Sequence, residues 1–146
     1  MVDHKNKRIG FLLERTTRNA KLSFTKAFKK LGVEITPEQW IVIDTINKNG
    51  TMSQKSIGQL SFKNAPTISR IIDNLVKKGL VDRLEEKGDR RKTSISITAN
   101  GANLIKNCQM EVDKLRSLSW EGLTDSDYED FTRILDKVFE NFAGYE

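Results

Sequence analysis

Cysteine and histidine each occur only once in this chain of 146 residues, and both shortages exclude classes of protein. The single cysteine, Cys108, excludes an internal disulfide framework, and together with the single histidine, His4, it excludes a Cys/His zinc site. Because His4 lies in a polar N-terminal segment, we expect no Ser–His or Cys–His pair for nucleophilic catalysis. The sequence therefore indicates no metal, no cofactor and no catalytic residue, and we expect a protein that is not an enzyme.

Long apolar runs are missing as well. No segment approaches the ~20 consecutive apolar residues that a bilayer span needs, and no signal-peptide pattern opens the chain. Apolar residues make up 37% of the sequence, which is enough for a core, while charged residues make up 31%. We therefore expect one domain over residues 1–146, located in the cytoplasm and without contact to a membrane.

The net charge of +5 is distributed unevenly. Residues 1–52 and residues 53–98 each carry 10 basic and 5 acidic side chains, whereas residues 99–146 carry 5 basic and 10 acidic ones. A basic part beside an acidic part favours a polyanionic partner for one part only. Charge alone is also consistent with an ordinary solvated surface, so a motif has to decide between the two interpretations.

Hydrophobic periodicity predicts six helices and one pair of strands, in the order α-α-α-α-β-β-α-α. The helices are expected over about residues 5–31, 37–48, 54–62, 65–78 and 99–122 and from residue 125 almost to the C-terminus, and the strands over 81–86 and 93–97. The sequence therefore predicts a mainly helical protein with one small β-hairpin.

Capping residues mark several of the helix starts. Thr36 and Gln39 form a capping box around Pro37 at the first helical position. Further N-caps are expected at Ser53, Asn64, Thr98 and Thr124. In the short helix over residues 54–62, Ile57 and Leu60 are expected to point into the core.

Two short helices joined by a tight connection and followed by a basic hairpin describe a winged helix-turn-helix. The helix over residues 65–78 has an apolar face made of Ile68, Ile71, Ile72 and Leu75. Its opposite face carries Pro66, Thr67, Arg70, Asp73, Asn74 and Lys77. Hydroxyl, amide and guanidinium groups of this kind can bond base edges in a DNA major groove, although many such faces are merely solvated.

The hairpin tip over residues 87–92 concentrates positive charge on a narrow loop that fits a minor groove. Asp89 interrupts this charge, and it is placed to orient the Arg91 guanidinium by a charge-assisted hydrogen bond. A charged, solvated turn is the alternative interpretation of the tip. The tip and the preceding helix, adjacent in sequence, favour DNA binding more strongly together than either does alone.

Several linked motifs resemble the MarR family of transcriptional regulators. The run from Thr67 to Arg83 resembles the recognition helix of that family and its exit. Asp89-Arg90-Arg91 resembles the Asp-x-Arg motif of the wing, and Ile97-Thr98-Ala99-Asn100-Gly101 resembles the Leu-Thr-x-x-Gly start of the next helix. The run from Ile35 to Trp40 matches a common opening of the second helix, so that the similarity spans residues 6–143 in order and spacing.

The resemblance implies a winged helix-turn-helix lobe over residues 53–98, with dimerisation helices over about residues 5–31 and 99–146. It also implies a homodimer that binds a pseudo-palindromic site on double-stranded DNA and regulates transcription, most often as a repressor. Large apolar side chains in the terminal helices favour a dimer independently, with the core of a monomer as the alternative place for them. These side chains are Phe11, Phe24, Phe28, Trp120, Phe131, Phe139 and Phe142.

The family motif assigns roles to residues of the lobe. Groove contacts are expected from Thr67, Ser69, Arg70 and Asn74, of which Ser69 lies toward the flank of the exposed face. Phosphate contacts are expected from Ser53, Gln54 and Lys55. In the wing, Asp89 and Arg91 match the motif, and Arg90 and Lys92 are added because of their charge.

The resemblance leaves the regulatory signal open. Members of the family commonly release DNA when a small, often aromatic effector binds, and others respond to oxidation of a cysteine. Cys108 lies on an apolar helix stripe without a basic residue one turn away, which favours packing over redox chemistry. Phe24, Phe28 and Trp40 fit either a ligand pocket or the core, so no ligand-binding residue is assigned.

An alternative function for the same fold is a winged-helix module that binds an acidic protein surface without reading a DNA sequence. The groove-compatible polar side chains on the helix over residues 65–78 argue against this alternative.

Overall fold

The structure is a computed structural model that describes residue 5, residues 7–86 and residues 89–145. The side chains of residues 86–92 lie outside this description. The chain forms two compact units, one that ends at Val112 and one that begins at Asp113. The two units are described separately below.

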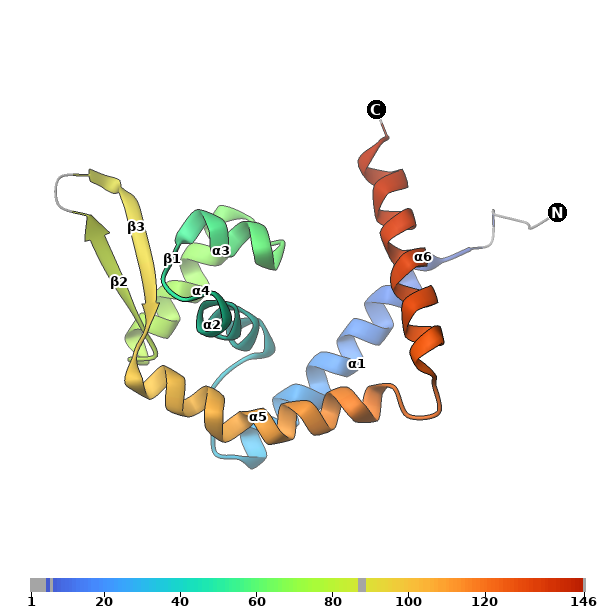
Figure 1. Cartoon of the computed structure of the whole chain (residues 1–146), viewed down its shortest axis with the longest axis horizontal. Helices are drawn as coiled ribbons and strands as arrows, with labels where there is room; N and C mark the ends of the chain where they lie inside the picture. The colour runs from blue at the N-terminus through green and yellow to red at the C-terminus, as the bar shows by residue number, and fades with distance from the viewer. Residues whose placement is uncertain (1–4, 6, 87–88, 146) are drawn as a thin grey trace. The chain divides into compact units, whose positions relative to one another are not determined.

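The first unit contains most of the secondary structure (Figure 1). Its elements are α1 (Ile9–Lys30), α2 (Pro37–Asn49), β1 (Met52–Ser53), α3 (Gln54–Ser61), α4 (Ala65–Lys77), β2 (Val81–Glu86), β3 (Asp89–Ile97) and the part of α5 (Ala99–Ser119) up to Val112. Helices and one small antiparallel sheet in this order make a winged helix-turn-helix, as the sequence predicted. All expected helices are present, with ends shifted by a few residues.

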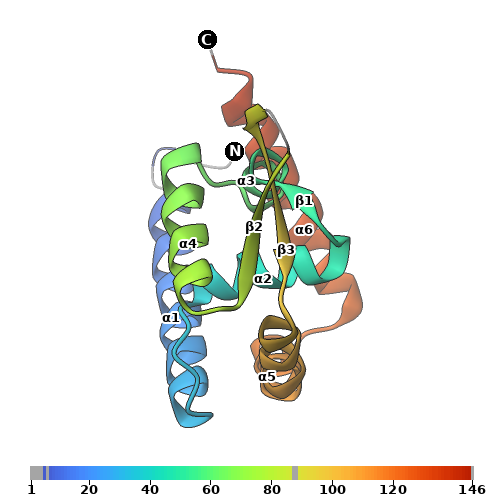
Figure 2. The same cartoon turned by 90° about the vertical axis from the view of Figure 1, so that its left-hand side faces the viewer.

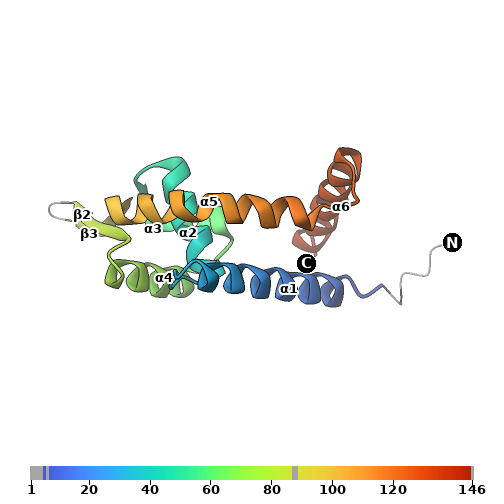
Figure 3. The same cartoon turned by 90° about the horizontal axis from the view of Figure 1, so that it is seen from below.

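The sheet has three strands in the order β1-β3-β2, whereas the sequence predicted only a hairpin. The additional strand β1 pairs antiparallel with β3, so that Met52 lies opposite Ile95 and Ser53 opposite Ser94. Strand β3 also begins at Asp89, before the expected start at Thr93, because backbone pairing continues into a charged segment whose composition resembles a turn. Figures 1 and 3 show β2 and β3 extending away from the helices of the lobe.

The core of the first unit lies where α2, α3 and α4 meet the sheet and the start of α5. The apolar face predicted for α4 is buried without exception, since Ile68, Ile71, Ile72 and Leu75 are all within the core. Figure 2 shows α4 beside β2, with the sheet next to the helices. Burial of this apolar face stabilises the fold by about 25 cal/mol per Å² of apolar surface removed from water. The opposite, polar face of α4 is not needed for the core and can contact a partner.

Two expectations about apolar side chains were wrong. Leu60 does not point into the core but is 57% exposed. Ile57 is buried as expected, and Gly58 is buried beside it. A Cβ at Gly58 would lie only 3.2 Å from the Lys63 carbonyl oxygen, so the missing side chain allows this close approach. Phe28 was expected either in the dimer surface or in a pocket or the core, and because it is fully buried in the core the dimer-surface interpretation is wrong for it.

The predicted N-caps are present. The Thr36 hydroxyl accepts a hydrogen bond from the Gln39 amide at 3.1 Å, and the Gln39 side chain accepts one from the Thr36 amide at 3.1 Å. The Asn64 side chain accepts from the Thr67 amide at 2.9 Å, which fixes the start of α4 directly after the turn. Equivalent caps occur at Ser53, Thr98 and Thr124.

Helix α5 starts in close contact with the loop that follows α4. The Thr98 hydroxyl donates to the Gly79 carbonyl oxygen at 2.7 Å, and the Thr98 amide donates to the Leu80 carbonyl oxygen at 3.1 Å. One turn later Gly101 packs directly on Leu80, since a Cβ on Gly101 would lie 2.1 Å from the Leu80 carbonyl oxygen. Glycine is therefore required at this contact.

The second unit consists of the end of α5 and the helix α6 (Asp125–Ala143). The Trp120 ring packs edge-on against Tyr128 and Phe131, with ring centroids 5.0 and 5.7 Å away. No residue of α6 is buried, although the helix carries a continuous apolar stripe. Among the residues that the structure describes, no helix is both long and apolar enough to cross a bilayer.

Candidate nucleic-acid interface

The polar face of α4 is the first component of the candidate site. Arg70 is exposed on it, while Thr67 and Asn74 are half-buried along the edge that faces α2. Ser69 is also half-buried, on the flank where the sequence placed it. The face is thus built from a guanidinium, an amide and a hydroxyl on a rigid helix whose other side is locked into the core.

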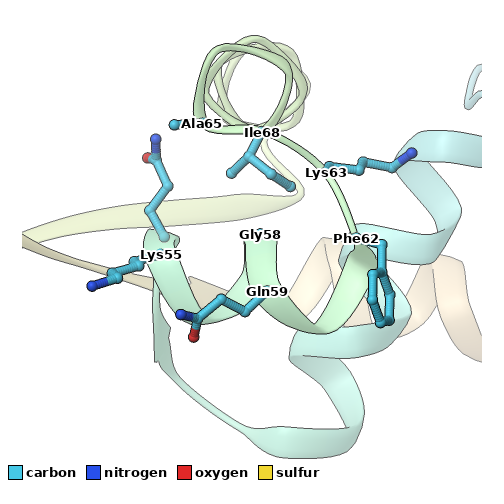
Figure 4. Close-up of a pocket in the computed structure, with 8 residues that line it drawn as sticks. Lys55, Gly58, Gln59, Phe62, Lys63, Ala65 and Ile68 are labelled. Carbon is cyan, nitrogen blue, oxygen red and sulfur yellow. The ribbon is translucent and has the colours of Figure 1, made fainter. Parts of the chain in front are cut away.

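The start of α3 meets the start of α4 at a hollow of about 720 Å³. Gln54 and Lys55, two of the predicted phosphate contacts, line this hollow together with Ala65 of α4 (Figure 4). The Ser53 hydroxyl already bonds within α3, because it accepts from the Ser56 amide at 3.1 Å. The positive ends of both helix dipoles therefore lie close to the predicted phosphate contacts.

The wing is connected to α4 by an ion pair that the sequence reasoning missed. Arg83 of β2 bonds Asp73 of α4, with 2.7 Å between the Arg83 Nη2 and Asp73 Oδ1 atoms. The spacing of Asp73 and Arg83 in the sequence does not predict this ion pair, because the pair depends on how β2 is placed beside α4. The side chains predicted to act at the wing tip, those of Asp89, Arg90, Arg91 and Lys92, lie outside the described residues.

A second missed network connects the end of α4 to the start of α2. The Lys78 ammonium donates to the Glu34 carbonyl oxygen at 2.5 Å and to the Gln39 side-chain oxygen at 3.0 Å. Gln39 is buried, so that its side chain is held by both its own capping box and Lys78. These bonds fix the orientation of α4 relative to α2.

A polar groove of about 490 Å³ runs between α1, α2 and α4. Its wall on α4 is formed by Ile71 and by three of the four side chains that were predicted to read bases, Thr67, Arg70 and Asn74. Across the groove, Lys21 of α1 forms an ion pair with Glu38 of α2, with 2.7 Å between the Lys21 Nζ and Glu38 Oε1 atoms. The hydrogen bond from Lys21 lowers the pKa of the Glu38 carboxyl below its usual value.

The aromatic side chains that fitted either a pocket or the core belong mainly to the core. Phe28 and Trp40 are buried with their ring centroids 5.5 Å apart, and Phe24 packs against Phe28 at 6.2 Å. Trp40 is only 4% exposed, yet among the described residues its indole N–H has no hydrogen-bond acceptor. An unpaired buried donor costs about 1–3 kcal/mol, so this N–H is a position where an incoming oxygen would be favourable.

Cys108 is fully buried among the apolar residues of the core, as its position on the α5 stripe predicted. Burial raises the pKa of the Cys108 thiol above its usual value, because the thiolate loses its hydration. A buried thiol with a raised pKa is a packing residue and reacts slowly with oxidants.

The chain is similar in sequence to known regulators. Residues 33–92 match the MarR family. Over 116 residues the chain is 29% identical to the HTH-type transcriptional repressor IacR of Pseudomonas putida, which covers 80% of this chain and 68% of that protein. IacR is a transcriptional repressor, the class of protein that the sequence motifs resemble.

Two solved structures share the fold. One is the complex of S. aureus MepR with DNA, with a TM-score of 0.81 and 20% identity over 93% of this chain and 99% of that one. The other is Bordetella bronchiseptica BpsR, whose DNA binding is regulated by 6-hydroxynicotinic acid, with a TM-score of 0.80 and 18% identity over 100% of both chains. Residues 33–92 thus match the MarR family, a relative in sequence is a transcriptional repressor, and the chain shares the fold of these two DNA-binding proteins.

Proposed function

We propose that the protein is a sequence-specific regulator that binds double-stranded DNA as a homodimer and represses transcription by covering a promoter. The observation that carries the proposal is the polar face of α4, whose opposite face is entirely buried. A helix held in this way can enter a major groove without a change of its own packing. The relatives support the proposal, since IacR is a repressor and MepR was solved in complex with DNA.

The roles of the individual residues follow from their positions. Thr67, Arg70 and Asn74 would contact base edges, with Ser69 at the border of the contact. Gln54, Lys55 and the N-cap residue Ser53 would contact phosphates and set the register of the helix on the duplex. At the wing, Asp89, Arg90, Arg91 and Lys92 are proposed on their sequence alone.

The apolar surface of the terminal helices supports the homodimer. Along α6 the side chains of Phe131, Ile134, Phe139 and Phe142 are each close to half exposed or more. Helix α1 likewise exposes Phe11 and several leucines. Apolar surface of this extent on two helices is unusual for a monomer and is typical of a subunit interface. Two-fold symmetry would place two copies of α4 on the two halves of a palindromic site.

Replacing Arg70 by Ala tests the base-reading role. We expect affinity for the preferred duplex to fall by on the order of 1–3 kcal/mol, with relaxed preference at particular base pairs. Arg70→Lys is the matched control, because it keeps the charge and loses the planar fork that bonds guanine at two positions. Binding measured on a set of single-base variants of the duplex checks both changes. The base-reading role would be contradicted if Arg70→Ala lost the same affinity on every duplex and Arg70→Lys kept the wild-type affinity. Arg70 would then be a phosphate contact.

We also propose that a small aromatic acid releases the protein from DNA. The unpaired, buried indole N–H of Trp40 supports this, because a ligand oxygen near it would gain a hydrogen bond that the free protein lacks. The effect of 6-hydroxynicotinic acid on BpsR is a precedent in a protein of the same fold.

Trp40→Phe keeps an aromatic ring in the core, removes the indole N–H donor and shortens the side chain by one fused ring. We expect at least one compound from a panel of hydroxylated aromatic carboxylic acids, beginning with 6-hydroxynicotinic acid, to release the wild-type protein from its duplex at millimolar concentration. The Trp40→Phe variant should keep its DNA affinity and respond at least tenfold more weakly, in line with the loss of about 1.4 kcal/mol or more. Equal release of both proteins, or release of neither by the whole panel, would contradict the proposal.

A further inference from the structure

The groove between α1, α2 and α4 carries more positive than negative side chains, and ion pairs within the groove do not neutralise the excess. Three of its side chains are cationic, Lys21, Lys63 and Arg70, and one is anionic, Glu38. Lys21 is paired with Glu38, whereas Lys63 and Arg70 form no ion pair within the described part of the chain. Two uncompensated cations in one groove favour an anion there.

The location of Lys63 makes it accessible to such an anion. Lys63 lies in the turn between α3 and α4, one residue before the N-cap Asn64. In Figure 4 its side chain leaves the turn in a different direction from Phe62, and its ammonium group extends away from Gly58 and α3. The same side chain lines the groove on the side of Glu38, where its positive charge contributes to the lowered pKa of that carboxyl.

The groove is continuous with the base-reading face of α4. Thr67, Arg70 and Asn74 form its wall, so a duplex that brought bases to these side chains would bring its own backbone to the opening of the groove. The hydroxyl of Thr67 and the amide of Asn74 supply donors beside the two cations. Hydrogen-bond donors and positive charge together are the groups that bind phosphate.

We propose that this groove binds a backbone phosphate of the operator, with Lys63 as its main contact and Lys21 as a positioning residue. Lys21 holds the Glu38 carboxylate in an ion pair, which reduces the repulsion between that carboxylate and the phosphate. The proposal rests on the proposed function and adds two lysines to the DNA interface, one of them from α1. Neither lysine was among the contacts expected from the sequence.

Substitution of Lys63 is the direct test. The slope of log affinity against log salt concentration is negative, and losing one phosphate contact makes it shallower by about 0.9. The same loss lowers affinity about fivefold at 0.15 M salt. We therefore expect Lys63→Ala to show both changes, equally on the preferred duplex and on unrelated duplexes, because a phosphate contact carries no sequence information. Lys26→Ala is the matched control, since Lys26 is an exposed lysine of α1 that does not line the groove.

Glu38→Gln is expected to change duplex affinity in the opposite direction from Lys63→Ala. It keeps the size of the side chain, removes the negative charge from the groove and frees Lys21, so duplex affinity should rise about two- to fivefold and the salt slope should not fall. Circular dichroism of each variant establishes that the fold is retained.

The failure of this inference is distinguishable from the failure of the proposed function. If the wild-type protein prefers no duplex, the proposed function is wrong. If it has a preferred duplex, but Lys63→Ala and Lys26→Ala share the wild-type salt slope, only the phosphate contact is wrong. Calorimetric titration with inorganic phosphate separates the two sources of the anion. Saturable binding of free phosphate that Lys63→Ala abolishes, with unchanged duplex binding, would make the groove a site for a free anion and contradict the proposal.

Discussion

Replacing Gly101 by Ala is expected to destabilise the protein by on the order of 2–4 kcal/mol, although alanine normally stabilises a helix relative to glycine. The added Cβ would lie 2.1 Å from the Leu80 carbonyl oxygen and 2.8 Å from a side-chain carbon of Ile97. The first of these neighbours is backbone, so the clash is relieved only if α5 moves away from the loop after α4. That movement would also strain the Thr98 bonds to Gly79 and Leu80.

Gly10→Ala is the matched control, because Gly10 also lies in a helix and a Cβ there would have no neighbour within 4 Å. Its effect should be stabilising, by about 0.5 kcal/mol. Urea unfolding followed by circular dichroism measures both variants. If Gly101→Ala were as stable as Gly10→Ala, the inferred close packing of α5 on the loop after α4 would be contradicted.

If the protein is the proposed homodimer, the combined substitution of Ile134→Glu and Phe142→Glu should dissociate it and reduce affinity for a two-half-site duplex by about a hundredfold or more. Both side chains are at least half exposed in the chain, so their replacement leaves the packing of Trp120 with Tyr128 and Phe131 intact. In a dimer the two copies would bury four carboxylates without partners, each costing several kcal/mol.

Ile134→Leu with Phe142→Leu is the control, since it preserves an apolar surface. Analytical ultracentrifugation gives the mass of each variant, and binding to full and half operators gives the affinity. A variant with two glutamates that sediments as a dimer would place the subunit interface elsewhere.

Much of the lobe could be predicted because its determinants are local in sequence. The capping box at Thr36 and the cap at Asn64 depend on residues three positions apart, and the buried face of α4 depends only on helical spacing. These features fixed the polar face of α4 and hence the predicted positions of Thr67, Arg70 and Asn74.

The missed features depend on contacts between distant segments. Strand β1 has only two residues and exists because β3 offers a free edge to pair with. Leu60 is exposed because the close approach at Gly58 turns α3, which periodicity over one short helix did not reveal. The Lys78 bonds to Glu34 and Gln39 span about 40 positions of sequence, as the two hydrogen-bond separations of 44 and 39 residues show.

The measurement that tests the central claim most directly is selection of duplexes from a random pool by the purified protein, followed by titration of the selected duplexes across salt concentrations. A dimeric regulator that reads bases through α4 should enrich an inverted repeat with half-sites about one helical turn apart. Its specific affinity should exceed its affinity for unrelated duplexes by about 10³-fold or more. A pool that stays unenriched, with weak and salt-sensitive binding to every duplex, would show counterion release alone and contradict the account.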